Sequence, residues 1–359
     1  MSNLESSGDL RQKLATELKR EVSQQLKDKA ISDFTITSLG DYCDIVELIT
    51  EEWRVTAAKR QVDKDKPAPF NCGELSPWFR GVSNNTYKCE PTLFRFYNEN
   101  LTNFKGLGER SPEIYEAEDY FFQRFKAYGL PYIGKWAGNW VPSNDLEWHF
   151  LMRHYEIPSR LLDWSKGSFI SLYFAIMKSL NTSANTDSAV WMLEPRRLTE
   201  FCHYNRNIYK ANRQRYEEAY KNYFLLDQEI DNEQGKKEAL DKKMTAMKER
   251  YPLPIIPDLI SPRITAHIGR FTLHTFEEGG MQRFAKDAYR MDGISYLVKI
   301  NIPSDKHFPI CRNLRTTGVS DMNFSQDLDG LTKELALRIT LGQRDHNFFV
   351  ERNMENDID

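Results

Sequence analysis

The sequence predicts an α+β fold in which helices flank a mixed or antiparallel sheet and a long helical segment is inserted into the domain. Three observations predict this fold. Short runs rich in β-branched and aromatic residues, such as "AVWMLEP" and "YLVKINIP", lie between longer stretches with helical periodicity. Residues 199–250 carry many charges, one glycine and no proline, which is typical of helices. The apolar share of 40%, with 21 Phe, 17 Tyr and 7 Trp, indicates a folded core.

The N-terminal segment has the pattern of an exposed amphipathic helix. Leu10, Leu14, Leu18, Val22 and Leu26 recur every four residues between charged ones. Such a helix either docks on a partner or packs against its own domain. We expect five segments along the chain: this helix at 1–30, the first part of the domain at 31–198, the charged helical insertion at 199–250, the second part of the domain at 251–345 and a polar tail at 346–359.

Local start and stop signals place the other elements around the predicted strand "PWFRGVS". Ser111, Pro112 and Glu113 predict the start of a helix over 111–127, whose aromatic residues we expect in the core. Asn144 and Glu147 predict a capped helix over 145–155. The remaining expectations are helices at 41–55, 168–180 and 328–340, a loop at 129–144, and strands at 189–195, within 263–275 and within 296–303.

Composition and motifs exclude several classes of protein. Lys and Arg number 49 and Asp and Glu 52, so the net charge of -3 gives no global attraction to nucleic acid or membrane. The five cysteines include no CxxC pair, which argues against a zinc site or a disulfide framework. No segment has the length and apolarity of a signal peptide or a membrane span. P-loop, Rossmann, GxSxG and HExxH motifs are absent. We therefore expect a cytoplasmic protein without metal or membrane partner.

The tetrapeptide "WFRG" at 78–81 places an arginine in an aromatic strand before a turn glycine. Arg80 in this setting either forms a buried ion pair or receives an anion, because a planar guanidinium fits both carboxylate and phosphate. Arg95, in "PTLFRFY", adds positive charge close by along the chain. The sequence leaves both interpretations of Arg80 open.

A dense group of polar residues precedes the apolar segment "FISLYFAI". It lies at the connector between two predicted helices, where side chains are held from two sides and can line a pocket. The alternative is that these residues only stabilise the fold. In that case Arg160 pairs with Asp163, Ser165 caps a helix, and His154 is buried with a hydrogen bond. The members of the group are His154, Tyr155, Ser159, Arg160, Asp163, Trp164 and Ser165.

Two further stretches offer candidates for proton transfer. In "SPRITAHIGRFTLHT", Arg263, Thr265 and His267 share one face of a predicted strand, and the ordinary pKa of histidine suits an acid or a base. A structural histidine is the alternative. In "NFSQDLDGLTKEL", Asp327 and Asp329 precede a helix, where aspartate usually serves as a cap. A metal site is disfavoured there because no third ligand lies at a matching spacing.

Tyrosines and basic residues are interleaved along 203–224. Aromatic faces beside cationic groups suit single-stranded nucleic acid, through base stacking and phosphate contacts. The alternative is a tyrosine stripe packed on the main domain. The candidate nucleic-acid-binding residues are Arg206, Tyr209, Lys210, Arg213, Arg215 and Tyr216.

Taken in order, these blocks resemble the FRG domain family, which is named after its Phe-Arg-Gly motif. The blocks are W-F-R-G at 78–81, H-Y-x-x-P-S-R-L-L-D-W-S at 154–165 with L-Y-F-A at 172–175, R-I-x-A-x-x-G-x-F-T at 263–272 and D-L-D-G-L at 327–331. The resemblance covers roughly 35–195 and 255–340. This chain has Glu156, Ser159 and His267 where the family more often has Gly, Thr and Gln.

The resemblance implies a core of ADP-ribosyltransferase-like type and NAD as the substrate. It implies that Arg80, beside Gly81, holds the NAD diphosphate, and that Tyr155 or Trp164 offers an aromatic face to the nicotinamide. The residues implied around the nicotinamide ribose are Ser159, Arg160, Asp163 and Ser165, and His154 is a further cofactor-binding candidate. Those implied to assist catalysis are Arg160, His267 and Asp329.

We therefore expect an NAD-dependent ADP-ribosyltransferase-like toxin or phage-defence effector that modifies nucleic acid or protein, with an antitoxin or chaperone as a candidate partner. Two alternatives stay open. The chain is a non-catalytic sensor or adaptor for a nucleotide or a phage component, or it is a metal-independent ribonuclease-like toxin that uses His154 and His267.

Overall fold

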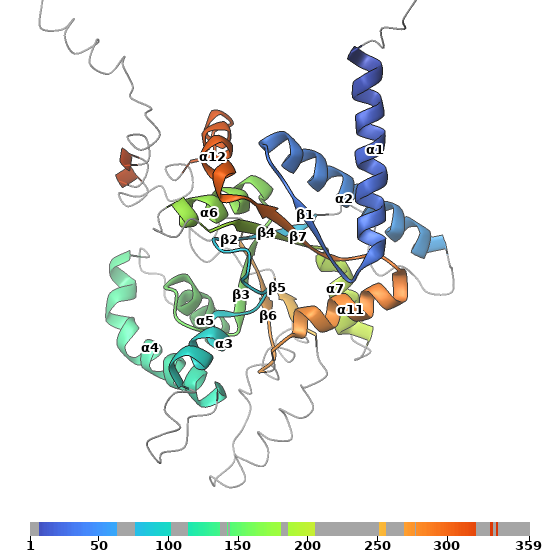
Figure 1. Ribbon diagram of the computed structural model, residues 1–359. Helices are drawn as coiled ribbons and strands as arrows, with labels where there is room; N and C mark the ends of the chain where they lie inside the picture. The colour runs from blue at the N-terminus through green and yellow to red at the C-terminus, as the bar shows by residue number, and fades with distance from the viewer. Residues whose placement is uncertain are drawn as a thin grey trace, which may run out of the picture.

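A mixed sheet forms the centre of the molecule in the computed structural model (Figure 1). The structure describes residues 7–62, 76–101, 114–136, 142, 144–180, 186–204, 251–255, 269–276, 278–320, 331–332 and 335–336. Within these residues the sheet has seven strands in the order β1-β7-β4-β2-β3-β6-β5. Helices flank it, so the predicted α+β class with a mixed sheet is confirmed.

The pairing of the strands is antiparallel except at one edge, where β1 is parallel to β7. The central strand β4 is buried along its whole length, as expected for a strand with neighbours on both sides and cover on both faces. The strands are β1 (Ile31–Thr35), β2 (Trp78–Val82), β3 (Leu161–Ser165), β4 (Ser188–Leu193), β5 (Leu253–Ile255), β6 (Gly269–Leu273) and β7 (Leu297–Ile302).

Most of the flanking helices are short, and those nearest the predicted site are α3, α5 and α6. The α-helices are α1 (Ser7–Asp28), α2 (Leu39–Val62), α3 (Thr92–Phe96), α4 (Ile114–Trp136), α5 (Asp145–His154), α6 (Ser168–Leu180), α7 (Pro195–Tyr204), α11 (Gly280–Asp292) and α12 (His307–Thr316). A π-helix (Tyr97–Leu101) follows α3, and a 3₁₀ helix (Ser304–Lys306) precedes α12.

The predicted helix at 168–180 is confirmed as α6, which lies against β2 and β4. The contact is closest at Gly81, where an added Cβ would lie 2.8 Å from the backbone nitrogen of Ala175 and would also meet the carbonyl oxygen of Ser171. Glycine is therefore required at this position by the approach of the helix backbone. Gly81, expected beside the cofactor, serves as the packing point between β2 and α6.

The neighbouring strands β2 and β3 barely pair with each other. β2 and β4 are in register over five residue pairs, whereas β2 and β3 share only Phe79 with Ser165. The strands β3, β6 and β5 then form a smaller part of the sheet, and β3 and β6 run toward the lower part of the view in Figure 1. This β2–β3 junction leaves backbone groups that need other partners.

The N-terminal helix α1 packs against its own domain through its second half. Val22 and Leu26 are buried in the main core, whereas Leu14 is 58% exposed. The contact of α1 with α2 and β1 agrees with the packed alternative for these residues.

Two expectations were wrong about where helices begin and end. The segment 129–144 was expected to be a loop, but α4 continues through Gly129 and Pro131 to Trp136. The predicted strand at 189–195 ends at Leu193, because Pro195 starts α7. The capped helix is confirmed as α5, with the Asn144 side chain accepting a hydrogen bond from the backbone N–H of Glu147 at 3.0 Å.

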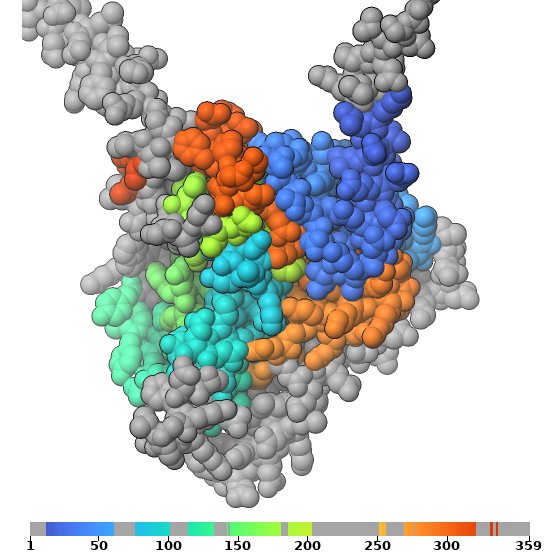
Figure 2. All heavy atoms as spheres, viewed as in Figure 1, coloured from blue at the N-terminus to red at the C-terminus, as the bar shows by residue number. Residues whose placement is uncertain are grey.

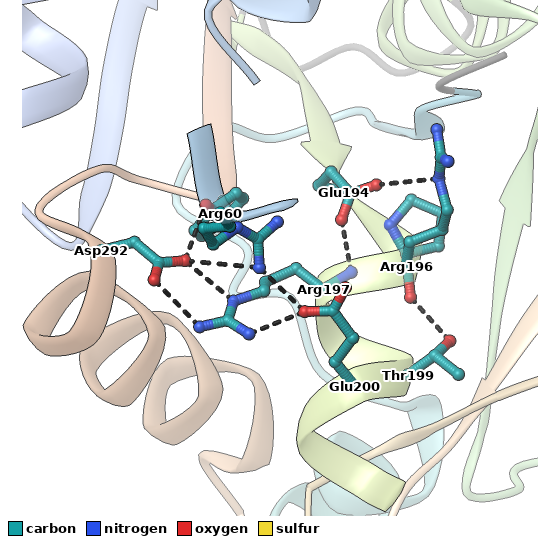
Figure 3. Close-up of polar contacts among 9 residues, drawn as sticks. Arg60, Glu194, Arg196, Arg197, Thr199, Glu200 and Asp292 are labelled. Atoms are coloured by element: carbon teal, nitrogen blue, oxygen red, sulfur yellow. Dashed lines mark hydrogen bonds and ion pairs between the residues drawn. The ribbon is translucent and has the colours of Figure 1, made fainter. Parts of the chain in front are cut away.

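Ion pairs tie the start of α7 to α2 and α11 (Figure 3). Arg197 lies 2.9 Å from Asp292 of α11 and donates to Glu200 at 2.7 Å, and Arg60 of α2 donates to Glu200 at 2.8 Å. The buried Glu194 accepts a hydrogen bond from the backbone N–H of Arg197 and so caps the helix. This network fixes α7 at the end of β4.

Several expected elements lie outside the described residues. These are most of the charged insertion at 199–250, the first part of the strand region at 263–275, most of the helix at 328–340 and the polar tail. Within the described ranges no helix is long and apolar enough to cross a membrane, and no group of three His, Cys, Asp or Glu side chains is placed to hold a metal ion.

Candidate anion-binding site

Arg80 bridges the β2–β3 junction. Its Nη1 donates to the Asp163 backbone carbonyl at 2.8 Å and lies 2.7 Å from the Asp163 carboxylate. The guanidinium thus replaces the ladder hydrogen bonds that the diverging strands do not make. The Arg80 side chain retains 10% exposure and the Asp163 side chain 47%, so the pair lies at the edge of the interior rather than in its depth.

Arg153 of α5 approaches the same carboxylate from the other side. Its Nε and Nη2 donate to one carboxylate oxygen of Asp163 at 2.8 and 2.6 Å. The end of α5 sets this position: Ile157 N–H donates to Met152 and Glu156 N–H to Arg153, the pattern of a Schellman cap. Glu156 takes the left-handed conformation that this cap requires, with φ at 61°. Glycine would adopt that conformation without strain.

Arg95 of α3 is the third guanidinium in this region. Its Nη1 donates to the backbone carbonyl of Glu90 at 3.3 Å, and its guanidinium lies 5.5 Å from the Tyr87 ring centre. Burial lowers the pKa of Arg95, and the charges of Arg80 and Arg153 lower it further. The three arginines therefore lie within electrostatic range of one another.

Two guanidiniums share one carboxylate at the centre of this cluster. Burial opposes ionisation of Asp163, but the charges of Arg80 and Arg153 outweigh it and hold the pKa of this carboxyl well below its ordinary value. The second carboxyl group, Glu90, is buried, and burial raises its pKa. Glu99 and Glu156 add negative charge near Arg95 and Arg153, so positive charge exceeds negative charge only locally, where the guanidiniums of Arg80 and Arg153 share the single Asp163 carboxylate.

Two buried polar atoms of the site have no hydrogen-bond partner among the described residues. They are Nε of Arg80 and Oγ of Ser159. Most buried polar atoms in proteins are paired, so unpaired ones at a charged cluster indicate a place for an additional group. Ser159 itself is fully buried, and its backbone carbonyl accepts a hydrogen bond from Leu93 at 3.4 Å.

Arg160 lies away from the cluster. Its Nε lies 2.6 Å from the Glu118 carboxylate of α4, its backbone N–H donates to the other Glu118 oxygen at 2.9 Å, and its guanidinium lies 3.7 Å from the Phe276 ring centre. The Arg160–Asp163 pair of the structural alternative does not form, because Asp163 is held by Arg80 and Arg153. Full burial gives Arg160 a positioning role, joining α4 to the start of β3.

The remaining residues of 154–165 divide between interior and surface. Trp164 is 3% exposed and its indole donates to Thr272 at 3.0 Å, so it offers no free aromatic face. Ser165 accepts a hydrogen bond from the Gly167 backbone at 2.9 Å. His154 and Tyr155 lie edge to face at the end of α5, and Tyr155 is 55% exposed. Of the two expected aromatic faces, only that of Tyr155 is open.

Several predicted site residues lie outside the described residues. They are the catalytic candidates His267 and Asp329 and the nucleic-acid-binding candidates Arg206, Tyr209, Lys210, Arg213, Arg215 and Tyr216.

Sequence reasoning missed three residues around the site: Arg153, Glu118 and His274. His274 is buried, and burial together with the charges of Arg80 and Arg160 lowers its pKa to about 3, so it is neutral at pH 7. Arg153 had a signal, since it directly precedes the polar group at 154–165 and ends a predicted helix. Glu118 had none, because its partner Arg160 lies 42 residues away in the sequence.

The fold and the cluster define an α+β domain with a group of arginines at the junction of β2 and β3, where its sheet has few paired residues. A comparison with known families identifies this domain: residues 76–184 match the FRG domain, and the chain therefore carries an FRG domain. The matched region runs from β2 to α6 and contains Arg80, Arg95, Arg153 and Asp163. No curated protein and no solved structure matches the chain.

Proposed function

We propose that the chain binds NAD as a substrate, through its diphosphate, at Arg80, Arg153 and Arg95, and transfers ADP-ribose to nucleic acid or protein. The observation that supports this proposal is the convergence of two guanidiniums, from β2 and α5, on one half-exposed carboxylate, with a third arginine in electrostatic range. Arginine forks suit the oxygens of a diphosphate, which carries two negative charges. The resemblance of the sequence blocks to the FRG family supplies the link to NAD.

Asp163 has a definite part in this proposal. Without ligand, its carboxylate orients the Arg80 and Arg153 forks and lowers the repulsion between them. A diphosphate would take over one or both guanidiniums, so that ligand and Asp163 compete for the same donors. Because Asp163 already holds the two arginine side chains in place, they lose little conformational entropy when a ligand binds.

The reaction itself replaces one bond to the ribose by another. The bond between the ribose C1 and the nicotinamide nitrogen breaks, the nicotinamide leaves with the bonding electrons, and a nucleophile of the acceptor binds C1. Tyr155, with its open ring, is the candidate face for the nicotinamide. His267 and Asp329 remain the candidates for taking the proton of the nucleophile.

A second candidate function is a non-catalytic sensor. It is favoured by the fact that Arg80 already has a carboxylate partner, because a ligand that displaces Asp163 also loosens the β2–β3 junction. Binding would then change how β3 and α5 are held, and a partner would detect that change.

Calorimetry with NAD, ADP-ribose and inorganic pyrophosphate tests the binding step. Arg80→Lys and Arg153→Lys should each weaken binding about tenfold or more, because lysine keeps the charge and loses the fork. Arg290→Lys, at a position where the side chain is 76% exposed, is the matched control and should bind as the wild type does. Asp163→Asn should bind more tightly, because it removes the competing carboxylate.

Transfer of label from NAD to total RNA, to DNA or to lysate, with release of nicotinamide, tests the reaction. Binding without transfer or nicotinamide release supports the sensor and contradicts the enzyme. A protein that binds none of the three ligands contradicts both functions. Shortening of RNA without NAD would also contradict them and would favour the ribonuclease alternative.

A further inference from the structure

One row of side chains crosses four strands on the face of the sheet that carries Arg80. Across the sheet, Asp33 of β1 pairs with Lys299 of β7, Lys299 pairs with Trp191 of β4, and Trp191 pairs with Arg80 of β2. Register partners project to the same face, so the row leads from the edge strand to the candidate anion site. Lys299 carries a positive charge 5.7 Å from the centre of the Trp191 ring.

Trp191 differs from the buried Trp53 and Trp164 in its indole N–H. Trp53 donates to the Ser295 carbonyl at 2.7 Å, and Trp164 donates to Thr272 at 3.0 Å. Trp191 is 6% exposed, and its Nε1 is buried with no partner in the part of the chain that the structure describes. Buried N–H donors are rarely left unpaired, since the loss of hydration is not compensated.

The residue beside Trp191 has the same property. Nε of Arg80 is buried and unpaired within the described ranges, although its Nη1 is used by Asp163. Nε is the guanidinium nitrogen nearest to the strand, and Arg80 and Trp191 are opposite each other across the β2–β4 ladder. Two N–H donors without acceptors thus occur on neighbouring residues of one face.

Residues 83–91, which we call the strap, pass over this face. Lys299 donates to the backbone carbonyl of Asn85, and Cys89 is fully buried within electrostatic range of Arg80 and Asp163. Residues 78–101, in cyan, lie at the front of the molecule in Figure 2, with α11, in orange, on one side and α4, in green, on the other. The Arg80 side chain is 10% exposed, so this row of side chains reaches solvent at Arg80.

We propose that Trp191 is a ligand-binding residue: its indole N–H and Nε of Arg80 together receive one anionic oxygen of a phosphate or diphosphate. The proposal rests on the proposed function in taking the NAD diphosphate as the natural source of that oxygen. Lys299 strengthens the attraction from the same row. The donor pair would make the site selective for ligands that present an oxygen at the β2–β4 side of Arg80.

The indole N–H of Trp191 allows a direct test in the full-length protein. In ¹⁵N–¹H spectra, the Trp191 signal is assigned by its loss in Trp191→Phe and by its shift in Lys299→Gln. Titration with inorganic pyrophosphate and, separately, with NAD should move this signal downfield. Trp191→Phe should weaken the affinity for pyrophosphate about tenfold, the effect of losing one charged hydrogen bond.

Trp53→Phe is the matched control, because it removes an indole N–H that already has a partner. It should lower the melting temperature and leave the affinity unchanged. If Trp191→Phe fails to fold, the signal assigned by Lys299→Gln still reports on the wild type.

The outcomes separate the two proposals. If NAD binds by calorimetry while the Trp191 signal stays in place, the inference is overturned and the proposed function stands. If pyrophosphate moves the signal and NAD does not bind, the donor pair is supported and NAD is excluded as its ligand. If neither ligand binds, both proposals are overturned.

Discussion

Arg80 and Asp163 contact each other twice, once through the Asp163 carboxylate at 2.7 Å and once through its backbone carbonyl at 2.8 Å. The second contact joins a side chain of β2 to the backbone of β3. The arginine of the FRG motif therefore has a structural role beside any part in ligand binding, and substitutions at this position change both.

Arg80→Ala should lower the free energy of unfolding by about 2 kcal/mol, less than for a fully buried pair because Asp163 is half exposed. Urea denaturation measures the change. Arg290→Ala, which breaks an exposed pair with Asp287, should change the stability by less than about 0.5 kcal/mol. Equal effects of the two substitutions would show that Arg80 does not bridge the strands.

Glu118→Gln should lower the free energy of unfolding by about 3 kcal/mol, because the guanidinium of Arg160 loses the charge of its buried partner. Chemical denaturation gives the value. Replacing both residues, in Glu118→Leu with Arg160→Met, should cost less than the sum of the single replacements, as for coupled neighbours. Additive losses would mean that the two residues stabilise the fold independently.

Glu156→Gly should raise the free energy of unfolding by about 1 kcal/mol, because φ of 61° strains a residue with a side chain. Thermal unfolding detects the gain as a higher melting temperature. Glu156→Ala is the control, since alanine keeps the strain, and it should leave the stability nearly unchanged. A similar gain from alanine would point to the glutamate charge instead.

Glu194 should make stability depend on pH near neutrality. Burial raises the pKa of this carboxyl from 4.5 to about 7, although the Arg197 backbone N–H and the charge of Arg196 oppose the shift (Figure 3). The folded state therefore prefers the protonated form. Its stabilising effect is complete below pH 4.5 and is lost as the pH rises through 7, a loss of about 3 kcal/mol from this group.

Glu194→Gln should remove that dependence, because the amide oxygen still accepts the Arg197 backbone hydrogen bond and carries no charge. Urea denaturation between pH 5 and pH 8 measures the slope in both proteins. The variant should be the more stable protein at pH 8. Parallel pH profiles would show that Glu194 does not titrate in this range.

The elements predicted correctly from the sequence are those with local signals. Asn144 and Glu147 are neighbours on one helical turn, so their capping pattern identified α5. Local rules failed for α4, where Gly129 and Pro131 are tolerated inside a helix that packs against α5. The general rule describes the isolated helix and does not include that packing.

Arg80 and Asp163 were both candidate residues in the sequence, and the structure brings them into contact because β2 and β3 are neighbours in the sheet. The pairing of Arg160 was not predictable: Glu118 lies 42 residues away in the sequence. Asp163 looked like the natural partner while 159–165 was read as a connector. Residues 161–165 instead form a strand that carries Asp163 to Arg80 and Arg153, while Arg160, directly before that strand, pairs with Glu118.

The single Phe79–Ser165 pair between β2 and β3 has a mechanical consequence. A sheet opens first where the fewest hydrogen bonds must break, so the earliest local unfolding of this protein should separate β2 from β3. The hydrogen bond from the Arg80 guanidinium to the Asp163 carbonyl should be the last contact to break there. Amide protons on β3 that face β2 should accordingly exchange with solvent sooner than those that face β6.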